Sequence, residues 1–190
     1  MDHTTAQTKP RDRILEAAGR LFLRHGFRAV GVDTIIAEAG VAKMTLYAHF
    51  PSKDDLIVAY LERADEQFWA WLEDASVADG LRAKLVAMFD AVGKLADSPQ
   101  CLGCTFQGTA AEFPDPEHPG HRVALGHKQA VVARLRTLAE DAGLRDPADL
   151  AQQLLLLMDG AWVAARMFGP HNPGVQVAAA ARALIRAHDR

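Results

Sequence analysis

The stretch AGVAKMTLYAHFPSKDDL, residues 39–56, constrains the fold more than any other part of the chain. A helical pattern ends at Gly40, a second and very short helix follows, and Pro51 ends it. In that short helix Leu46 and Phe50 are four residues apart and therefore share one face, which is expected to dock on a core. Two short helices joined through a glycine turn predict a helix-turn-helix.

The other face of the short helix mixes polar and aromatic side chains. Lys43 and Thr45 lie in its first turn, where side chains and the positive helix end can reach bases and phosphates. Tyr47 and His49 can donate hydrogen bonds to phosphate oxygens, and Lys53 begins the next helix. This face suits the DNA major groove, which is about 12 Å wide. An ordinary amphipathic helix with a solvated face fits the same pattern, so spacing alone leaves both interpretations open.

The rest of the chain favours helix along most of its length. Hydrophobic residues make up 49% of the sequence, with Ala and Leu abundant and β-branched residues modest, so we expect an all-α fold. A helix is predicted over residues 11–27. Ser52 is a suitable N-cap for another helix that begins directly after Ser52. Later helices are expected at about 80–97, 104–112, 120–142, 147–168 and 175–188, with loops at 113–120 and 169–174.

Several classes of protein are disfavoured. No run of 18 uncharged apolar residues occurs, and the first residues lack the apolar core of a signal peptide, so we expect a cytoplasmic protein with no membrane partner. The net charge of −3 argues against a protein that binds polyanions over its whole surface. Phosphate loops, nucleophile elbows and clustered acid pairs are missing, so we expect no enzyme and no cofactor.

The chain has two cysteines, Cys101 and Cys104, and His118, His121 and His127 follow them. The spacing supplies half of a zinc site, but no second half with regular spacing accompanies it. A redox switch, a metal sensor and a pair of half-buried thiols are all compatible with the pattern, and we favour the thiols without a bound metal.

The stretch RILEAAGRLFLRHGFRAVGVDTIIAEAGVAKMTLYAHFPSKDDLIVAYL resembles the DNA-binding domain of the TetR family of bacterial transcriptional regulators. The elements ILEAA, LF, GF, IIAEAGV, TLYAHF and SKDDL occur in the family's order and spacing over roughly residues 11–61. The resemblance implies a helix-turn-helix domain at 1–55 and a helical ligand-binding and dimerisation domain at 56–190. It also implies a homodimeric repressor that binds palindromic operator DNA and is released by a small hydrophobic or amphipathic inducer.

The same resemblance assigns DNA contacts to six residues of this chain. Those expected to read bases are Lys43 and Met44, and those expected to hold the DNA backbone are Thr45, Tyr47, His49 and Lys53. The chain departs from the family at Gly31, where many members carry a Ser or Thr that caps the second helix and touches phosphate. Glycine has no side-chain atom that could make this contact.

The second half of the chain contains many apolar and aromatic residues that could line a ligand pocket. The candidates, including one polar anchor, are Trp71, Met88, Phe89, Phe106, Gln107, Phe113 and Trp162. Thr109 and Glu112 are further possible anchors. For each apolar candidate taken singly, core packing is the favoured explanation, although a cavity is still expected somewhere among them.

The last two helices carry apolar and small residues at helical spacing, among them Leu154, Met158, Ala161, Ala178 and Ala181. Such stripes form intramolecular cores, but a dimeric four-helix bundle needs them too, and the family resemblance assigns these helices to the homodimer. Two rival functions are compatible with the same sequence. One is a redox or metal sensor that uses the same DNA-binding domain, and the other is a small-molecule-binding helical protein without DNA affinity.

Overall fold

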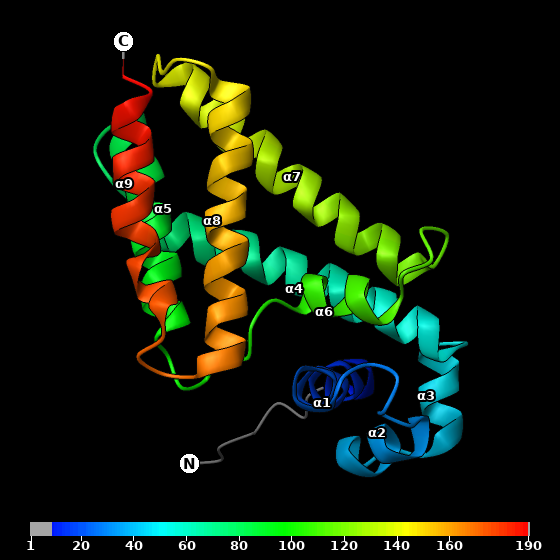
Figure 1. The fold of residues 1–190 in the computed structure, drawn as a ribbon. Coiled ribbons are helices and arrows are strands. Elements are labelled where there is room, and N and C mark those ends of the chain that lie inside the picture. The colour runs from blue at the N-terminus through cyan, green and yellow to red at the C-terminus, as the bar shows by residue number, and fades with distance from the viewer. Residues whose placement is uncertain (1–8, 190) are drawn as a thin grey trace, which may run out of the picture. The chain divides into compact units, whose positions relative to one another are not determined.

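The computed structural model describes residues 9–189, and every regular element in that range is helical (Figure 1). The expected all-α fold is confirmed. The described residues form two compact units. The first unit comprises residues 9–64 and 105–124, and the second comprises residues 65–104 and 125–189. The functional division expected from the sequence, 1–55 and 56–190, stays a prediction.

The first unit contains three complete N-terminal helices, α1 (Pro10–His25), α2 (Val32–Ala39) and α3 (Lys43–His49). It also contains the first part of α4 (Lys53–Ala75), all of α6 (Thr105–Glu112) and the first residues of α7 (Pro119–Asp141). Ser52 caps α4 as expected, because its hydroxyl accepts a hydrogen bond from the Asp55 amide at 3.1 Å.

The core of the first unit is built from the inward faces of these helices. Four aromatic rings form its centre, because Phe22 and Phe27 pack together and Tyr60 and Phe113 contact Phe27. Gly19 lets α1 approach α4 closely, since a Cβ atom at this position would lie 2.8 Å from the Tyr60 ring. The aliphatic core residues are Ile14, Leu15, Val30, Ile35, Leu46, Leu56, Ile57 and Leu61.

The second unit contains the rest of α4 and α7 together with α5 (Leu81–Ala96), α8 (Pro147–Phe168), a 3₁₀ turn at Pro173–Gln176 and α9 (Val177–Ala187). Helices α5, α8 and α9 pack side by side (Figure 1). The loop expected at 169–174 is partly wrong, because its last residues begin the 3₁₀ turn. Buried Asn172 accounts for this difference: its side chain accepts from the Gly174 amide at 2.8 Å and donates to the Ala96 carbonyl at 2.7 Å.

The apolar stripe that the sequence shows on α8 and α9 lies inside the second unit. The buried core cluster includes Leu154, Met158, Ala161, Ala178 and Ala181. These residues therefore form intramolecular core, the first of the two explanations that the sequence allows, and they are not available to a second copy of the chain. The surface of α8 carries a different apolar set, which includes Leu156, Val163 and Met167.

Candidate functional site

The turn between α2 and α3 is fixed by backbone conformation and by an arginine from α1. Gly40 adopts the left-handed conformation with φ 61°, and the amides of Gly40 and Val41 donate to carbonyls in the last turn of α2, as in a Schellman motif. Arg13 donates one guanidinium nitrogen to the carbonyls of Ala39 at 2.6 Å and Gly40 at 2.7 Å. The helix-turn-helix corner is thus hydrogen-bonded by protein groups and held against α1.

Helix α3 buries one face and exposes the other. Leu46 and Phe50 are fully buried, as the sequence predicts, and they anchor the helix on the core of the first unit. Met44 is 80% exposed and Tyr47 is 39% exposed. The residues of α3 named as DNA contacts lie as follows: Lys43, Met44, Tyr47 and His49 are exposed, and Thr45 is half-buried. Four of the six residues named as DNA contacts are therefore exposed on α3.

The exposed lysine of α3 has a weak partner. Lys43 Nζ lies 3.2 Å from a carboxylate oxygen of Asp33, and both side chains are largely exposed. Surface ion pairs of this kind contribute about 0–1 kcal/mol. A phosphate or a guanine edge can compete for this ammonium group at small cost.

Lys53 is placed differently from the residues of α3. Its side chain is half-buried, and Nζ lies 3.5 Å from the Arg28 carbonyl. Burial lowers the pKa of Lys53, while the nearby carboxylates of Glu112 and Asp54 oppose this shift. This lysine lies beside the α1–α2 connection and is not part of the exposed surface of α3.

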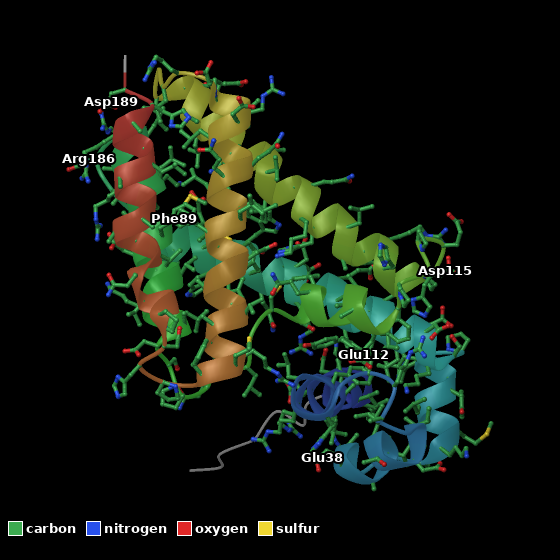
Figure 2. All side chains as sticks on the ribbon, viewed as in Figure 1. Glu38, Phe89, Glu112, Asp115, Arg186 and Asp189 are labelled. Carbon is green, nitrogen blue, oxygen red and sulfur yellow. The ribbon has the colours of Figure 1, made fainter. Side chains whose placement is uncertain are left out.

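Glu112 is a functional candidate whose position the sequence does not reveal. One carboxylate oxygen accepts the Phe27 amide at 2.9 Å, and the other accepts the Arg28 amide at 2.7 Å (Glu112 is labelled in Figure 2). The sequence suggests Glu112 as a polar anchor for a ligand, but its carboxylate is occupied by the helix-turn-helix unit. No local pattern could indicate this contact, because Phe27 lies 85 residues away in the chain.

The candidate ligand residues are divided between the two units. Trp71, Met88, Phe89 and Trp162 belong to the second unit, and the rings of Trp71 and Trp162 are 6.5 Å apart. Met88, Phe89 and Trp162 are buried in its core. The remaining candidates, Phe106, Gln107 and Phe113, belong to the first unit. There the Phe113 ring contacts Phe27 and stacks on His118 at 4.0 Å.

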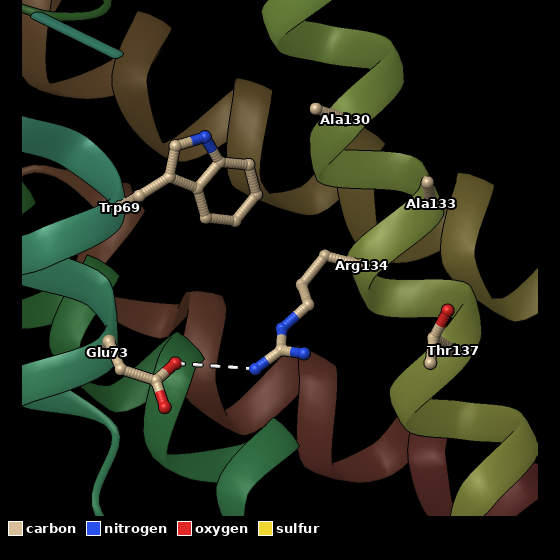
Figure 3. Close-up of a pocket in the computed structure, with 6 residues that line it drawn as sticks. All are labelled: Trp69, Glu73, Ala130, Ala133, Arg134 and Thr137. Carbon is tan, nitrogen blue, oxygen red and sulfur yellow. Dashed lines mark hydrogen bonds and ion pairs between the residues drawn. The ribbon is translucent and has the colours of Figure 1, made fainter. Parts of the chain in front are cut away.

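A hollow of about 580 Å³ lies between α4 and α7 in the second unit (Figure 3). Its lining residues are Trp69 and Glu73 from α4 and Ala130, Ala133, Arg134 and Thr137 from α7. Arg134 approaches Glu73 at 3.4 Å across the hollow, and Glu73 also pairs with Lys84. The two alanines create the space because their side chains are small. Nothing in the sequence distinguishes these two alanines, since alanine has no chemical signature of a binding site.

A buried polar cluster lies next to this hollow on the same helices. His127 is 5% exposed and its Nδ1 is 2.5 Å from a carboxylate oxygen of Asp65, which also accepts the Trp69 indole N–H at 3.1 Å. Burial lowers the pKa of His127, although the hydrogen bond and the charge of Asp65 act in the opposite direction. The cluster fixes the orientation of the Trp69 ring that lines the hollow.

Cys101 and Cys104 are half-buried free thiols packed against the core of the second unit. Within residues 9–189, no group of three or more His, Cys, Asp or Glu side chains is placed to hold a metal ion. In the same range, no helix combines the length and the apolar character needed to cross a membrane.

Comparisons with known proteins agree with this geometry. Residues 14–60 match the family model described as bacterial regulatory proteins, tetR family. The chain is similar to a TetR-family transcriptional regulator from Streptomyces coelicolor of known structure, with 33% identity, a TM-score of 0.90, and coverage of 97% of this chain and 98% of that one. It is also 28% identical over 174 residues to the HTH-type transcriptional repressor KstR2 of Rhodococcus jostii, covering 89% of this chain and 84% of the relative.

Proposed function

The chain belongs to the TetR family of bacterial transcriptional regulators, a non-enzymatic class, and on that premise we propose that it is a cytoplasmic, ligand-responsive repressor. In this proposal it binds palindromic operator DNA as a homodimer and leaves the DNA when a small hydrophobic or amphipathic inducer binds. The observation that carries the proposal is the surface of α3, where Lys43, Met44, Tyr47 and His49 are exposed around a buried apolar anchor.

The shape and charge of α3 support its placement in a major groove. The helix has seven residues and is held by Leu46 and Phe50, so its exposed face can enter a groove about 12 Å wide. We assign base contacts to Lys43 and Met44. We assign DNA backbone contacts to Thr45, Tyr47 and His49 on α3 and to Lys53 on α4, which would approach phosphate beside the α1–α2 connection.

A second copy of the chain is proposed to cover the outer face of α8. Leu156, Gly160, Val163 and Met167 follow one another at intervals of three and four residues, and all four are exposed. Leu156 is 71% exposed and Met167 is 73% exposed. Helix α9 packs beside α8 and exposes only small residues, Ala179 and Ala183, over its middle turns. These faces suit a four-helix dimer interface made by the last two helices of each subunit.

The inducer is proposed to bind in the second unit, with its entrance at the hollow of Figure 3. The indole of Trp69 and the two alanines offer an apolar surface, while Arg134 and Glu73 supply charges, which suits an amphipathic molecule. Trp71, Met88, Phe89 and Trp162 lie in the same unit and would contact a molecule that enters more deeply. Phe106, Gln107 and Phe113 belong to the first unit, and the ligand contacts that the sequence predicts for them stay a prediction.

Selection from a pool of random DNA duplexes tests the DNA-binding part. The wild-type protein is expected to enrich a palindrome whose half-site centres are about one helical turn, or 34–36 Å, apart. The double variant L156E/M167E is expected to be monomeric by light scattering and to lose specific binding, since one half-site supplies too few contacts. Q129E, an exposed site on α7, is the control. Failure of the wild-type protein to enrich any sequence would overturn the proposal.

The inducer part is tested separately by ligand screening. A molecule that quenches tryptophan fluorescence is expected to weaken DNA affinity by a coupling of about 1–3 kcal/mol, and DNA must weaken the affinity of that molecule equally. Release of DNA only on oxidation of Cys101 and Cys104, with no effective organic molecule, would replace the inducer by a redox signal.

A further inference from the structure

We propose that Glu112 is a positioning residue for DNA binding: its carboxylate fixes the connection between α1 and α2, and that connection sets the position of α2 and α3. This inference rests on the proposed function, because it assumes that α3 is the surface that binds DNA. It adds a residue of α6, far from the helix-turn-helix in the sequence, to the parts that the DNA-binding unit requires.

The connection between α1 and α2 leaves backbone amides that need partners from elsewhere. Helix α1 ends at His25, and Gly26, with φ 83°, turns the chain away from the helix axis. The next two amides, of Phe27 and Arg28, donate to the two oxygens of Glu112 at 2.9 and 2.7 Å. Hydrogen bonds to an ionised acceptor are about twice as strong as neutral ones. One carboxylate therefore fixes two successive peptide groups.

The fit around this carboxylate is close. A Cβ atom at Gly26 would lie 2.7 Å from Oε1 of Glu112, so the carboxylate lies directly against the backbone at this glycine. A shorter acid cannot reach both amides from the same position, and a larger residue at position 26 would displace the carboxylate. The site thus requires both the glycine and the full length of glutamate.

The residue after Glu112 strengthens the same connection. The Phe113 ring lies edge-on to Phe27 with centroids 6.0 Å apart, and the Arg28 guanidinium carbon lies 5.4 Å from the Phe113 centroid. Lys53, at the start of α4, donates to the Arg28 carbonyl at 3.5 Å. Polar, aromatic and cationic contacts therefore converge on two residues, Phe27 and Arg28.

A displacement of this connection must reach the DNA-binding surface. Helix α2 begins at Val32, four residues after Arg28, and its other end is joined to α3 by the short corner at Gly40. Arg13 ties that corner to α1. One end of α2 is thus held to α6 through Glu112, and the other end is held to α1 through Arg13. Loss of the Glu112 contacts removes one of these two ties and lets α2 and α3 shift.

Simple electrostatics predicts the opposite result for a change at Glu112, which makes the test decisive. Removing a negative charge near Lys53 should by itself strengthen binding to phosphate. If Glu112 acts by position, E112Q must weaken binding although it removes that charge, because the neutral amide offers a single and weaker acceptor. E117Q is the matched control, because Glu117 lies close to Glu112 in the sequence and its side chain is largely exposed. Among the ion pairs of the described residues, Glu117 pairs only with exposed Arg122.

The experiment measures DNA affinity and amide hydrogen exchange for the full chain. With the duplex that the wild-type protein selects, E112Q and E112D are expected to lose about tenfold in affinity, the effect of one charge-assisted hydrogen bond, while E117Q binds equally or more tightly. Without DNA, the amides of Phe27 and Arg28 should exchange at least about tenfold faster in E112Q and E112D only. E112D also keeps the charge, so it tests the inference if E112Q does not fold.

Two outcomes would overturn the inference. One is affinity in E112Q that equals or exceeds that of the wild-type protein, and the other is unchanged exchange at Phe27 and Arg28. Failure of the wild-type protein to bind any duplex would instead overturn the proposed function, and the exchange measurement, which needs no DNA, would still show whether Glu112 holds the connection.

Discussion

The two units differ in the direction in which their candidate binding residues point. In the first unit the DNA candidates on α3 face outward, because burial of Leu46 and Phe50 turns Lys43, Met44 and His49 to the surface. In the second unit the ligand candidates Met88, Phe89 and Trp162 face inward and are buried. Helical periodicity distinguishes an inner from an outer face, so it can locate a surface site. It cannot distinguish a residue that lines a cavity from one that fills a core.

The largest effect on stability is expected at a residue whose side chain is fully buried in the second unit. Ala181 on α9 is 0% exposed, so A181D would bury an unpaired carboxylate and lower the free energy of unfolding by about 3–5 kcal/mol. Urea denaturation followed by circular dichroism measures this change. A70D, on the exposed side of α4, carries the same substitution within a helix and should cost far less. Equal costs for the two variants would mean that position 181 is not core.

Helix positions could be predicted from the sequence because their signals are local. Pro147 at the start of α8 and Gly169 at its end bound a helix whose limits, 147–168, agree with the prediction. Ser52 and Gly40 act as the cap and the turn that their residue types indicate. Each signal depends on the backbone within a few residues, and therefore does not require knowledge of the tertiary structure.

Contacts between distant segments and empty space could not be predicted. Glu112 contacts Phe27 across 85 residues, and a glutamate at the end of a helix is usually a solvated surface residue. The hollow beside Trp69 arises from two alanines on α7, where small side chains leave volume unfilled. Single-sequence patterns describe the residues present, whereas a cavity depends on how facing helices are spaced.

A smaller effect is expected on the outward surface of α3, and it should leave stability unchanged. Y47A is expected to weaken binding to all DNA sequences alike by about 1–3 kcal/mol, because its proposed partner is phosphate. K43A should weaken binding similarly and also relax the preference at one base pair. Gel-shift titration on the selected duplex and on single-base variants separates the two effects. If neither variant alters affinity, α3 does not lie in the groove.

The buried histidine of the second unit is expected to make stability depend on pH. Because burial lowers the pKa of His127 in the folded protein, the unfolded chain binds a proton at higher pH than the folded chain does. Stability should therefore fall as pH decreases from the ordinary histidine pKa towards the lower folded-state value, with a slope of at most about 1.4 kcal/mol per pH unit.

Urea denaturation between pH 7 and 5 measures this slope. H127N should show a shallower slope than the wild-type protein, whatever its absolute stability. H171N, which changes an exposed histidine of the same unit, is the matched control. An unchanged slope in H127N would contradict the conclusion that burial lowers the pKa of His127.

The smallest effect on stability is expected at Gly31, the exposed N-cap residue of α2. This glycine has φ −79° and ψ 153°, an extended conformation that serine adopts without strain, and no side chain caps the helix here. A Cβ atom would meet nothing closer than the Thr34 hydroxyl oxygen at 3.9 Å, so a serine side chain has room. G31S is therefore expected to raise the free energy of unfolding by a few tenths of a kcal/mol, since serine caps slightly better than glycine.

The hydroxyl of G31S also adds a phosphate contact, so DNA affinity should rise by a similar or slightly larger amount. G31A has no side-chain oxygen to cap the helix, so it should raise neither stability nor DNA affinity. Thermal denaturation and gel-shift titration of the two variants test this, and an equal gain from G31A would assign the effect to the loss of glycine flexibility and not to capping.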